Sequence, residues 1–400
     1  NLNLIPYADS WAVWTITEMA VRSPLTWTDA WNRGDVRTLD QAMMAGWNTA
    51  SGDATALLIG VALWEFRNRV EKDVPPEDRA GRIAEVEALV APLLDDIVGC
   101  TGPVTAGPLA ILGHFLPQVI VLAPQWFDSV SARLLETGGE NPLEHPLWGA
   151  YLARGDFYPD SYRLLRAWYA RTAAAIPHES IDVDEAKRET DGGATEGLLV
   201  KVMAALIRGL AALGDNDRLI EHTVAKVSPK VRAHAYWQFF RGWSDQGEPV
   251  PAEVADRLTA FWAWRLDELE QVPESEARTI EIEGLMWFLS TPYLPVQQAI
   301  TLGRRTIALN TGKRRVTGNG WERMADLANE DPDGAYGLIG LLVEHELQEH
   351  GLVLFDQIAP ALRIAMQRGS VETRASVIRL VNRLGEAGQD EFKQLLPGPQ

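Results

Sequence analysis

Apolar residues recur along this chain at every third or fourth position, with polar residues between them. This spacing is typical of amphipathic helices, which pack one face against their neighbours. In residues 352–368, for example, Phe355, Ile358 and Leu362 fall on one face. Glycine and proline interrupt the pattern and mark the helix ends. Helices are predicted over residues 9–21, 39–47, 53–72, 77–98, 109–122, 126–135, 147–153, 161–176, 195–214, 228–243, 251–271, 274–289, 295–310, 321–328, 332–350, 352–368, 371–384 and 390–396.

Residues 195–214 form the most apolar stretch, which we expect to be a central buried helix. Only Lys201, Arg208 and Gly209 interrupt its aliphatic run over residues 198–213. A helix that is apolar on almost every side has to be covered on every side. Two charges, and a run shorter than the ~20 apolar residues that span a bilayer, argue against a membrane segment. Other helices of the protein should therefore cover it.

One apolar segment, residues 109–122, is open to two interpretations. Its β-branched tail of Val119, Ile120 and Val121 is also typical of a strand. A single strand would have no obvious partner here, so we favour a buried helix.

The predicted helices group into two regions separated by a polar segment. Residues 178–193 are acidic, end in glycine and carry no apolar period, as expected of a linker loop. The sequence thus predicts an N-terminal helical region over residues 1–177 and a C-terminal helical-repeat region over residues 194–400. Consecutive short helices without strands indicate an all-α fold, and specifically an α-solenoid of antiparallel helix pairs of the HEAT or TPR kind.

The amino-acid composition, and above all the net charge, limits which kinds of partner are expected. The 400 residues carry a formal net charge of −18, and phosphate contact requires a cationic surface. Nucleic acid and anionic membranes are therefore not expected as main ligands. The single cysteine, Cys100, cannot form an internal disulfide, which fits a reducing cytoplasm. The chain begins at Asn1 without a targeting signature, and we expect it to be part of a longer protein.

One charged residue lies on an apolar stripe. In residues 251–271, Arg265 falls on the same face as Leu258 and Trp262. A charge in that position needs a partner. We expect a structural ion pair there rather than a ligand-binding residue.

Motifs for chemistry are incomplete. The string from Glu344 to His350 resembles a zinc-protease helix, but its histidines His345 and His350 are five residues apart instead of four. Five residues place them about 140° apart around a helix, so they cannot share a metal on one face. The sequence also lacks a serine nucleophile elbow and a dinucleotide-binding glycine motif. We therefore expect no catalytic residue, no metal and no cofactor in this chain.

A basic cluster stands out in this acidic chain. One explanation for the cluster is structural, because the helix dipole favours cations near a helix C-terminus. The other is that the cluster binds an acidic protein or a phosphate group. Tryptophans near residues 237–287 could line a groove, although core packing is the favoured interpretation. The candidate partner-binding residues are Arg304, Arg305, Lys313, Arg314, Arg315 and Trp264.

Four segments of the C-terminal part have a distinctive helical pattern: FWAWRLDELE (261–270), GLMWFLST (284–291), WERMADLANEDPDGAYGLIGLLVE (321–344) and VIRLVNRLGEAGQDEFKQLL (377–396). They resemble the C-terminal helical regions of large bacterial anti-phage defence proteins. The resemblance extends over roughly residues 251–400, and residues 1–193 show none. In those proteins, a sirtuin-like or STAND-type effector precedes HEAT- or TPR-like repeats. The resemblance implies a cytoplasmic sensor or assembly module whose partner is a phage protein or another part of the same large protein.

Three hypotheses about function follow. The first is a non-enzymatic helical-repeat recognition module of a larger defence protein. The second is an all-α hydrolase that uses dispersed carboxylates and histidines such as Glu344, His345 and His350. The third is a structural scaffold or oligomerisation segment, which would present a large apolar self-interface. The incomplete motifs place the first hypothesis ahead.

Overall fold

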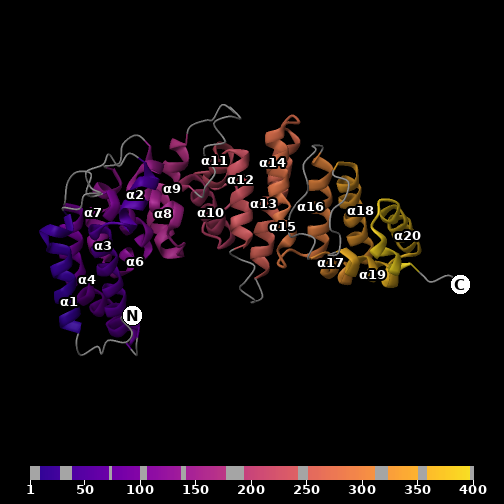
Figure 1. The fold of residues 1–400 in the computed structure, drawn as a ribbon. Helices are drawn as coiled ribbons and strands as arrows, with labels where there is room; N and C mark the ends of the chain where they lie inside the picture. The colour runs from indigo at the N-terminus through magenta and orange to yellow at the C-terminus, as the bar shows by residue number, and fades with distance from the viewer. Residues whose placement is uncertain are drawn as a thin grey trace. The chain divides into compact units, whose positions relative to one another are not determined.

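The structure is a computed structural model, and it describes residues 10–27, 38–71, 74–99, 106–136, 141–176, 193–241, 251–310, 323–349 and 358–396. Every regular element in these ranges is helical, which confirms the predicted all-α class (Figure 1). The chain divides into two compact units. Unit 1 contains residues 1–180 and 189–201, and unit 2 contains residues 181–188 and 202–400. The predicted linker 178–193 lies outside the described residues except for Gly193.

Unit 1 is built around the packing of α5 on α2 and α8, and of α3 on α1, α4 and α5. Its largest fully buried side chains include Trp148, Tyr151, Tyr162 and Tyr169. The elements of unit 1 are α1 (Ser10–Arg22), η3 (Pro24–Trp27), α2 (Leu39–Trp47), α3 (Ala50–Phe66), η5 (Arg67–Glu71), α4 (Pro76–Gly99), α5 (Ala106–His114), α6 (Leu116–Leu122), α7 (Pro124–Glu136), η7 (Pro142–Glu144), α8 (Pro146–Arg154), α9 (Pro159–Ala175) and the first part of α10 (Ala194–Ile207).

Unit 2 packs α12 on α14, α16 on α13 and α18, and α19 on α17, α18 and α20. Its aromatic core includes Tyr236, Phe261, Trp262 and Phe288. The elements of unit 2 are the end of α10, α11 (Leu219–Lys226), α12 (Pro229–Arg241), α13 (Ala252–Glu270), α14 (Glu276–Leu285), α15 (Trp287–Ser290), α16 (Val296–Leu309), α17 (Met324–Glu330), α18 (Pro332–Glu349), α19 (Ala359–Arg368), α20 (Val371–Glu386) and η11 (Asp390–Leu395).

Helix starts follow the capping chemistry of the sequence. Thr38 accepts a hydrogen bond from the Gln41 amide, and the Gln41 side chain accepts one from the Thr38 amide, so a capping box begins α2. The prediction of a helix over 39–47 is confirmed at both ends. Ser228 precedes Pro229, the first residue of α12, and the predicted helix start there is also confirmed.

The ambiguous segment 109–122 is helical, as we favoured. It forms the end of α5 and all of α6, and the two helices are separated at Phe115. Val119 and Ile120 are buried in the core of unit 1, whereas Val121 is exposed, so the three β-branched residues lie on different sides of a helix.

The predicted central helix over 195–214 is shorter than expected, because α10 ends at Ile207. The apolar run continues, but Gly209 adopts a positive φ of 69° and turns the chain. The side chain of Arg257 then caps the helix end by donating from Nη1 to the Ile207 carbonyl oxygen at 2.6 Å. A glycine and a cap from a distant helix therefore decide where α10 ends.

The expected burial of α10 is confirmed. Leu198, Leu199 and Val202 have no exposed surface. None of the described helices is both long and apolar enough to cross a bilayer. The division between the two units falls inside this helix, after Lys201.

Candidate functional site

The predicted basic cluster is only partly described. Arg304 and Arg305 lie on α16, where Arg304 is exposed and passes beside Gly337 of α18. Lys313, Arg314 and Arg315 lie outside the described residues. The structure therefore places only Arg304 and Arg305 of the five predicted cations.

Arg305 is engaged within unit 2. It crosses from α16 to α13, where it pairs with Glu270 Oε1 and Asp267 Oδ1, both at 2.6 Å. The hydrogen bond to Glu270 raises the pKa of Arg305, and the bond to Asp267 adds to this. Trp264 is half-buried on α13, with its ring 5.6 Å from that of Phe261. Arg305 therefore links α16 to α13, whereas the contact of Trp264 with Phe261 lies within α13.

The expected ion pair at Arg265 is confirmed. Arg265 donates to Glu281 on α14 from Nε to Oε1 at 2.5 Å and from Nη2 to Oε2 at 2.8 Å. Arg232 on α12 donates to the same Oε2 at 2.5 Å, and the Tyr236 hydroxyl donates to Oε1 at 3.3 Å. Glu281 has no exposed surface. This buried network joins α12, α13 and α14.

Charge complementarity keeps that network ionised. Burial alone would raise the pKa of Glu281, but the charges and hydrogen bonds of Arg232 and Arg265 outweigh burial and lower it. Burial likewise opposes the charged form of Arg265, yet its bonds to Glu281 raise its pKa. The buried charges therefore compensate one another.

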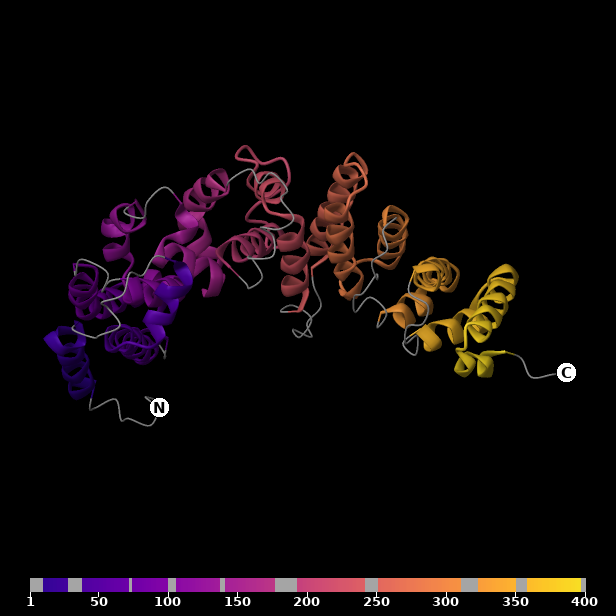
Figure 2. The same cartoon turned by 45° about the horizontal axis from the view of Figure 1, so that its top comes forward.

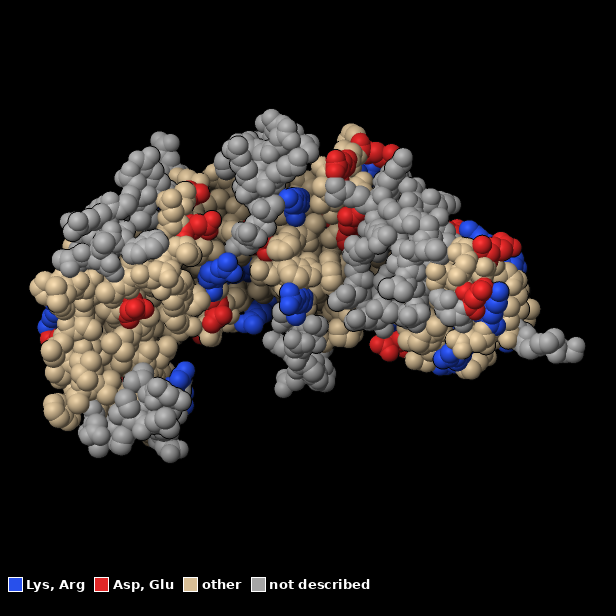
Figure 3. Space-filling view, in the orientation of Figure 1, with Lys and Arg blue, Asp and Glu red and all other residues tan. Residues whose placement is uncertain are grey.

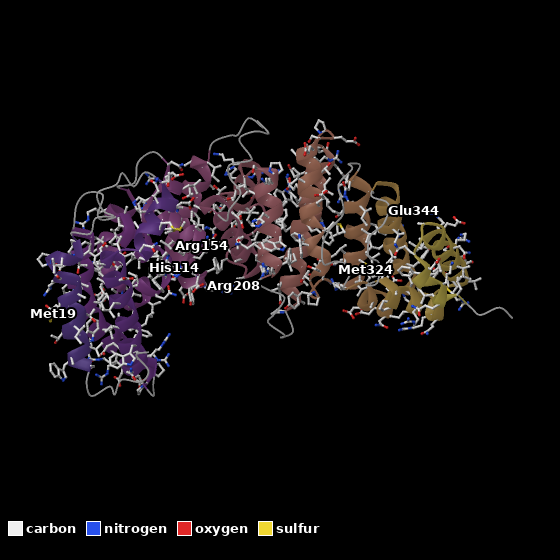
Figure 4. All side chains as sticks on the ribbon, viewed as in Figure 1. Met19, His114, Arg154, Arg208, Met324 and Glu344 are labelled. Atoms are coloured by element: carbon white, nitrogen blue, oxygen red, sulfur yellow. The ribbon has the colours of Figure 1, made fainter. Side chains whose placement is uncertain are left out.

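The zinc-protease-like string has no assembled site in the described structure. Glu344 is exposed on α18 and pairs with Arg383 at 3.0 Å (Figure 4). The side chains of His345 and His350 lie outside the described residues. Among the residues that are described, no group of three or more His, Cys, Asp or Glu side chains could hold a metal ion.

A buried lysine in unit 1 is the least ordinary titratable group. Lys201 on α10 donates from Nζ to the Leu152 carbonyl oxygen at 2.7 Å, near the C-terminal end of α8. The same nitrogen lies 5.1 Å from the centre of the Tyr151 ring. A cation at a helix C-terminus and over an aromatic face is favourably placed. The sequence shows Lys201 only as an interruption of an apolar run.

Burial lowers the pKa of Lys201 from 10.5 to about 7, and the negative charge of Asp156 opposes that change. His114 lies in the same neighbourhood, next to Arg154 in Figure 4. Burial lowers the pKa of His114 as well, and Asp156 again opposes the change. Burial therefore disfavours positive charge in both side chains, and the negative charge of Asp156 favours it.

An exposed apolar surface in unit 1 was not predicted. It consists of Trp11, Ile16 and Met19 on α1 and Leu25 on η3, which are 71%, 62%, 68% and 79% exposed. We call these four residues the α1 surface. Helix α1 lies at the edge of unit 1 (Figures 1 and 2), and Met19 is on the side turned away from α3 (Figure 4). Around α1, α3 and α4, the face visible in Figure 3 carries few charges.

Helix α1 is apolar on two opposite sides. Trp11, Met19 and Ile16 span an arc of about 140° at 100° per residue. The buried residues Thr17 and Val21 lie on the other side, which packs on α3 and α4. A pattern that is apolar on both faces is the sequence signal for such a surface, although it is equally typical of a buried helix.

No family model, curated protein or solved structure matches this chain.

Proposed function

We propose that this chain is a non-enzymatic protein-recognition module that binds a helix of a partner protein on the α1 surface. The observation that carries the proposal is the exposure of Trp11, Ile16 and Met19 on one side of α1, together with that of Leu25 on the adjoining η3. Contiguous apolar surface of this kind marks interaction sites, and tryptophan is enriched among the residues that dominate binding.

The packing of α1 within unit 1 indicates what kind of partner fits its exposed face. One face already packs against helices, so a second helix with an apolar stripe fits the opposite face in the same manner. Glu18 and Arg22 border the surface and pair with each other, and Arg22 also pairs with Asp96 of α4 at 2.8 Å. This polar border favours an amphipathic helix over a lipid surface, because its charges stay in water at the rim.

The wider architecture is part of the same proposal. In unit 2, helices that pack chiefly on helices one or two elements away in the chain support an α-solenoid of helix pairs. Solenoids serve as binding scaffolds because each added repeat extends their surface. A sensor or assembly role in a larger bacterial defence protein, with a phage protein or another part of that protein as partner, remains a prediction from the resemblance.

The proposal is tested by placing a photo-crosslinking amino acid at Thr15, which is exposed beside Trp11 on α1. We expect crosslinks to one protein, through a peptide that belongs to an amphipathic helix. That helix, made as a synthetic peptide, should bind the purified chain. Trp11→Glu combined with Met19→Glu should reduce this binding at least tenfold, because two charges would have to be desolvated.

The matched control carries the crosslinker at Ala174, which is exposed on α9 of the same unit. Circular dichroism should show an unchanged fold for the double variant, since both substituted side chains are exposed. Crosslinks between two copies of the chain would replace the proposal with self-association. Equal labelling from both positions would also contradict it, and stoichiometric metal in the purified chain would favour the hydrolase hypothesis.

A further inference from the structure

The methionines of this chain differ sharply in how far water reaches them. Met203, Met286 and Met324 lie in the core and are 2%, 3% and 0% exposed. In contrast, Met19 on α1 and Met44 on α2 are 68% and 58% exposed. A dissolved oxidant attacks a thioether according to its exposure. These two methionines are therefore within reach of such an oxidant, and the three core methionines are protected from it.

Met19 is at the centre of the α1 surface. Around the helix it lies between Trp11 and Ile16, about 80° from the first and about 60° from the second at 100° per residue. Ile16 precedes Met19 by three residues, so their side chains are neighbours on the helix. A partner helix that covers Trp11 and Ile16 therefore has to cover Met19 as well.

A hydroperoxide converts the Met19 thioether into a sulfoxide. A lone pair of the sulfur attacks one peroxide oxygen, so that an S–O bond forms while the O–O bond breaks. The sulfur gives up two electrons to the peroxide. The proton of the transferred oxygen passes to the leaving oxygen, which departs as water or as an alcohol. The product has a polar group where the thioether was apolar, and sulfoxide reductases can restore the thioether.

A sulfoxide at Met19 acts on binding and not on the fold. In the free chain this side chain is exposed, so water can satisfy the sulfoxide oxygen without any change in packing. The apolar stripe of a partner helix offers that oxygen no hydrogen-bond donor. Covering the α1 surface would then remove the hydration of a polar group without replacing it, which is unfavourable.

We propose that Met19 is a site of reversible oxidation by a hydroperoxide, and that its sulfoxide releases the partner helix from the α1 surface. The inference rests on the proposed function, because it concerns the same surface, and it adds the regulation of that surface. Two observations support it. Met19 is exposed at the centre of the surface, and the core methionines are buried, so an oxidant can change the surface while the core stays intact.

The test uses the purified full chain with the photo-crosslinking amino acid at Thr15. After treatment with dilute hydrogen peroxide, peptide mass spectrometry measures the sulfoxide at each methionine. We expect Met19 and Met44 to be oxidised before the three core methionines, with an unchanged circular dichroism spectrum. The peroxide is then removed and the chain is crosslinked in a dialysed bacterial lysate, which lacks small reductants. The crosslink yield should fall about tenfold relative to the untreated chain, and sulfoxide reductase should restore it.

Met19→Leu is the decisive variant, because leucine keeps the surface apolar and cannot form a sulfoxide. Its crosslink yield should not change with peroxide. Met44→Leu is the matched control, since it removes the other exposed thioether, on α2, and its yield should fall as in the parent.

The outcomes separate the inference from the proposed function. A specific crosslink that persists once Met19 is oxidised, or an equal loss in Met19→Leu and the parent, would overturn the inference and leave the proposed function standing. The absence of a specific crosslink from the untreated chain would overturn the proposed function and the inference with it.

Discussion

The two units bury cationic side chains in different ways. In unit 2, Arg232 and Arg265 share the carboxylate of Glu281, and all three side chains lie in the core. In unit 1, Lys201 is buried with a carbonyl oxygen and an aromatic ring as its near contacts, and the negative charge of Asp156 acts on it through space. One arrangement compensates charge with charge, and the other compensates it with dipoles.

The two ways of burying a cation make the units differ in their sensitivity to pH. A guanidinium bonded to a carboxylate keeps its proton at any ordinary pH, and the carboxylate stays ionised because its pKa is lowered. An ammonium compensated by dipoles has a lowered pKa, near 7 for Lys201. The stability of unit 2 should therefore depend strongly on the charge partners of its arginines and weakly on pH. The stability of unit 1 should depend strongly on pH and weakly on any single charge partner.

Replacing Glu281 with Gln has the largest expected effect. The substitution preserves size but leaves Arg232 and Arg265 without a negative partner in the core. Removing one partner of a buried ionic network costs about 3–5 kcal/mol. Urea unfolding should report that loss, and hydrogen exchange should become faster in α12–α14 than in α2, α5 and α8.

Glu270→Gln provides the contrast for this prediction. Glu270 also pairs with an arginine, Arg305, but on the surface, where solvent weakens the interaction. Its unfolding midpoint should stay close to that of the parent. If both variants lost the same stability, burial would not be the property that makes the Glu281 network important.

Replacing Lys201 with Met changes how stability depends on pH. With a pKa of about 7 in the folded chain and 10.5 when unfolded, Lys201 binds more protons in the unfolded state between these values. Stability should therefore rise with pH, by up to about 1.4 kcal/mol per pH unit between the two pKa values, and level off below the lower one. From about pH 7.5 to 9.5 we expect the parent to gain about 2.5 kcal/mol more than Lys201→Met.

The control for the pH series is Lys393→Met, because Lys393 is exposed and pairs with Asp390 on the surface. It should follow the pH profile of the parent. Urea unfolding at several pH values measures all three proteins. A parent profile that coincides with that of Lys201→Met would show that the ammonium finds a charge partner in solution.

The sequence predicted the helices of this fold well and its surfaces poorly. Local signals sufficed where caps and periodicity agree, as in α2, or where an apolar stripe required a partner for Arg265. The end of α10 was not predictable, because Arg257 caps it from 50 residues further along the chain. The spacing of apolar residues predicts which face of a helix is buried, but it cannot show a cap that a residue from another helix supplies.

Candidate sites were harder to predict for the same reason. Arg305 belongs to a basic cluster in the sequence, but folding places it against Asp267 and Glu270 of another helix. From the sequence alone, the apolar residues on the exposed face of α1 would be predicted to be buried. An apolar residue type does not show whether another helix covers it. Charge and hydropathy identify which residues need partners, and only the fold shows which ones have them.

Replacing Gly197 with Ala has a smaller expected effect on stability. Gly197 lies one turn before Lys201 on the same side of α10, and a Cβ there would come within 1.9 Å of the Leu152 carbonyl oxygen, which also accepts from Lys201. The added methyl group must push α10 away from α8, at a cost of about 2 kcal/mol for overpacking. Gly81→Ala in α4 is the matched control, because nothing lies within 4 Å of its Cβ and the substitution should stabilise the helix by about 0.5–1 kcal/mol. Urea unfolding should give opposite signs for the two variants. If Gly197→Ala also flattened the pH profile of the parent, close approach of the two helices would be what desolvates Lys201, and the pH sensitivity of unit 1 would follow from a missing side chain as much as from a buried charge.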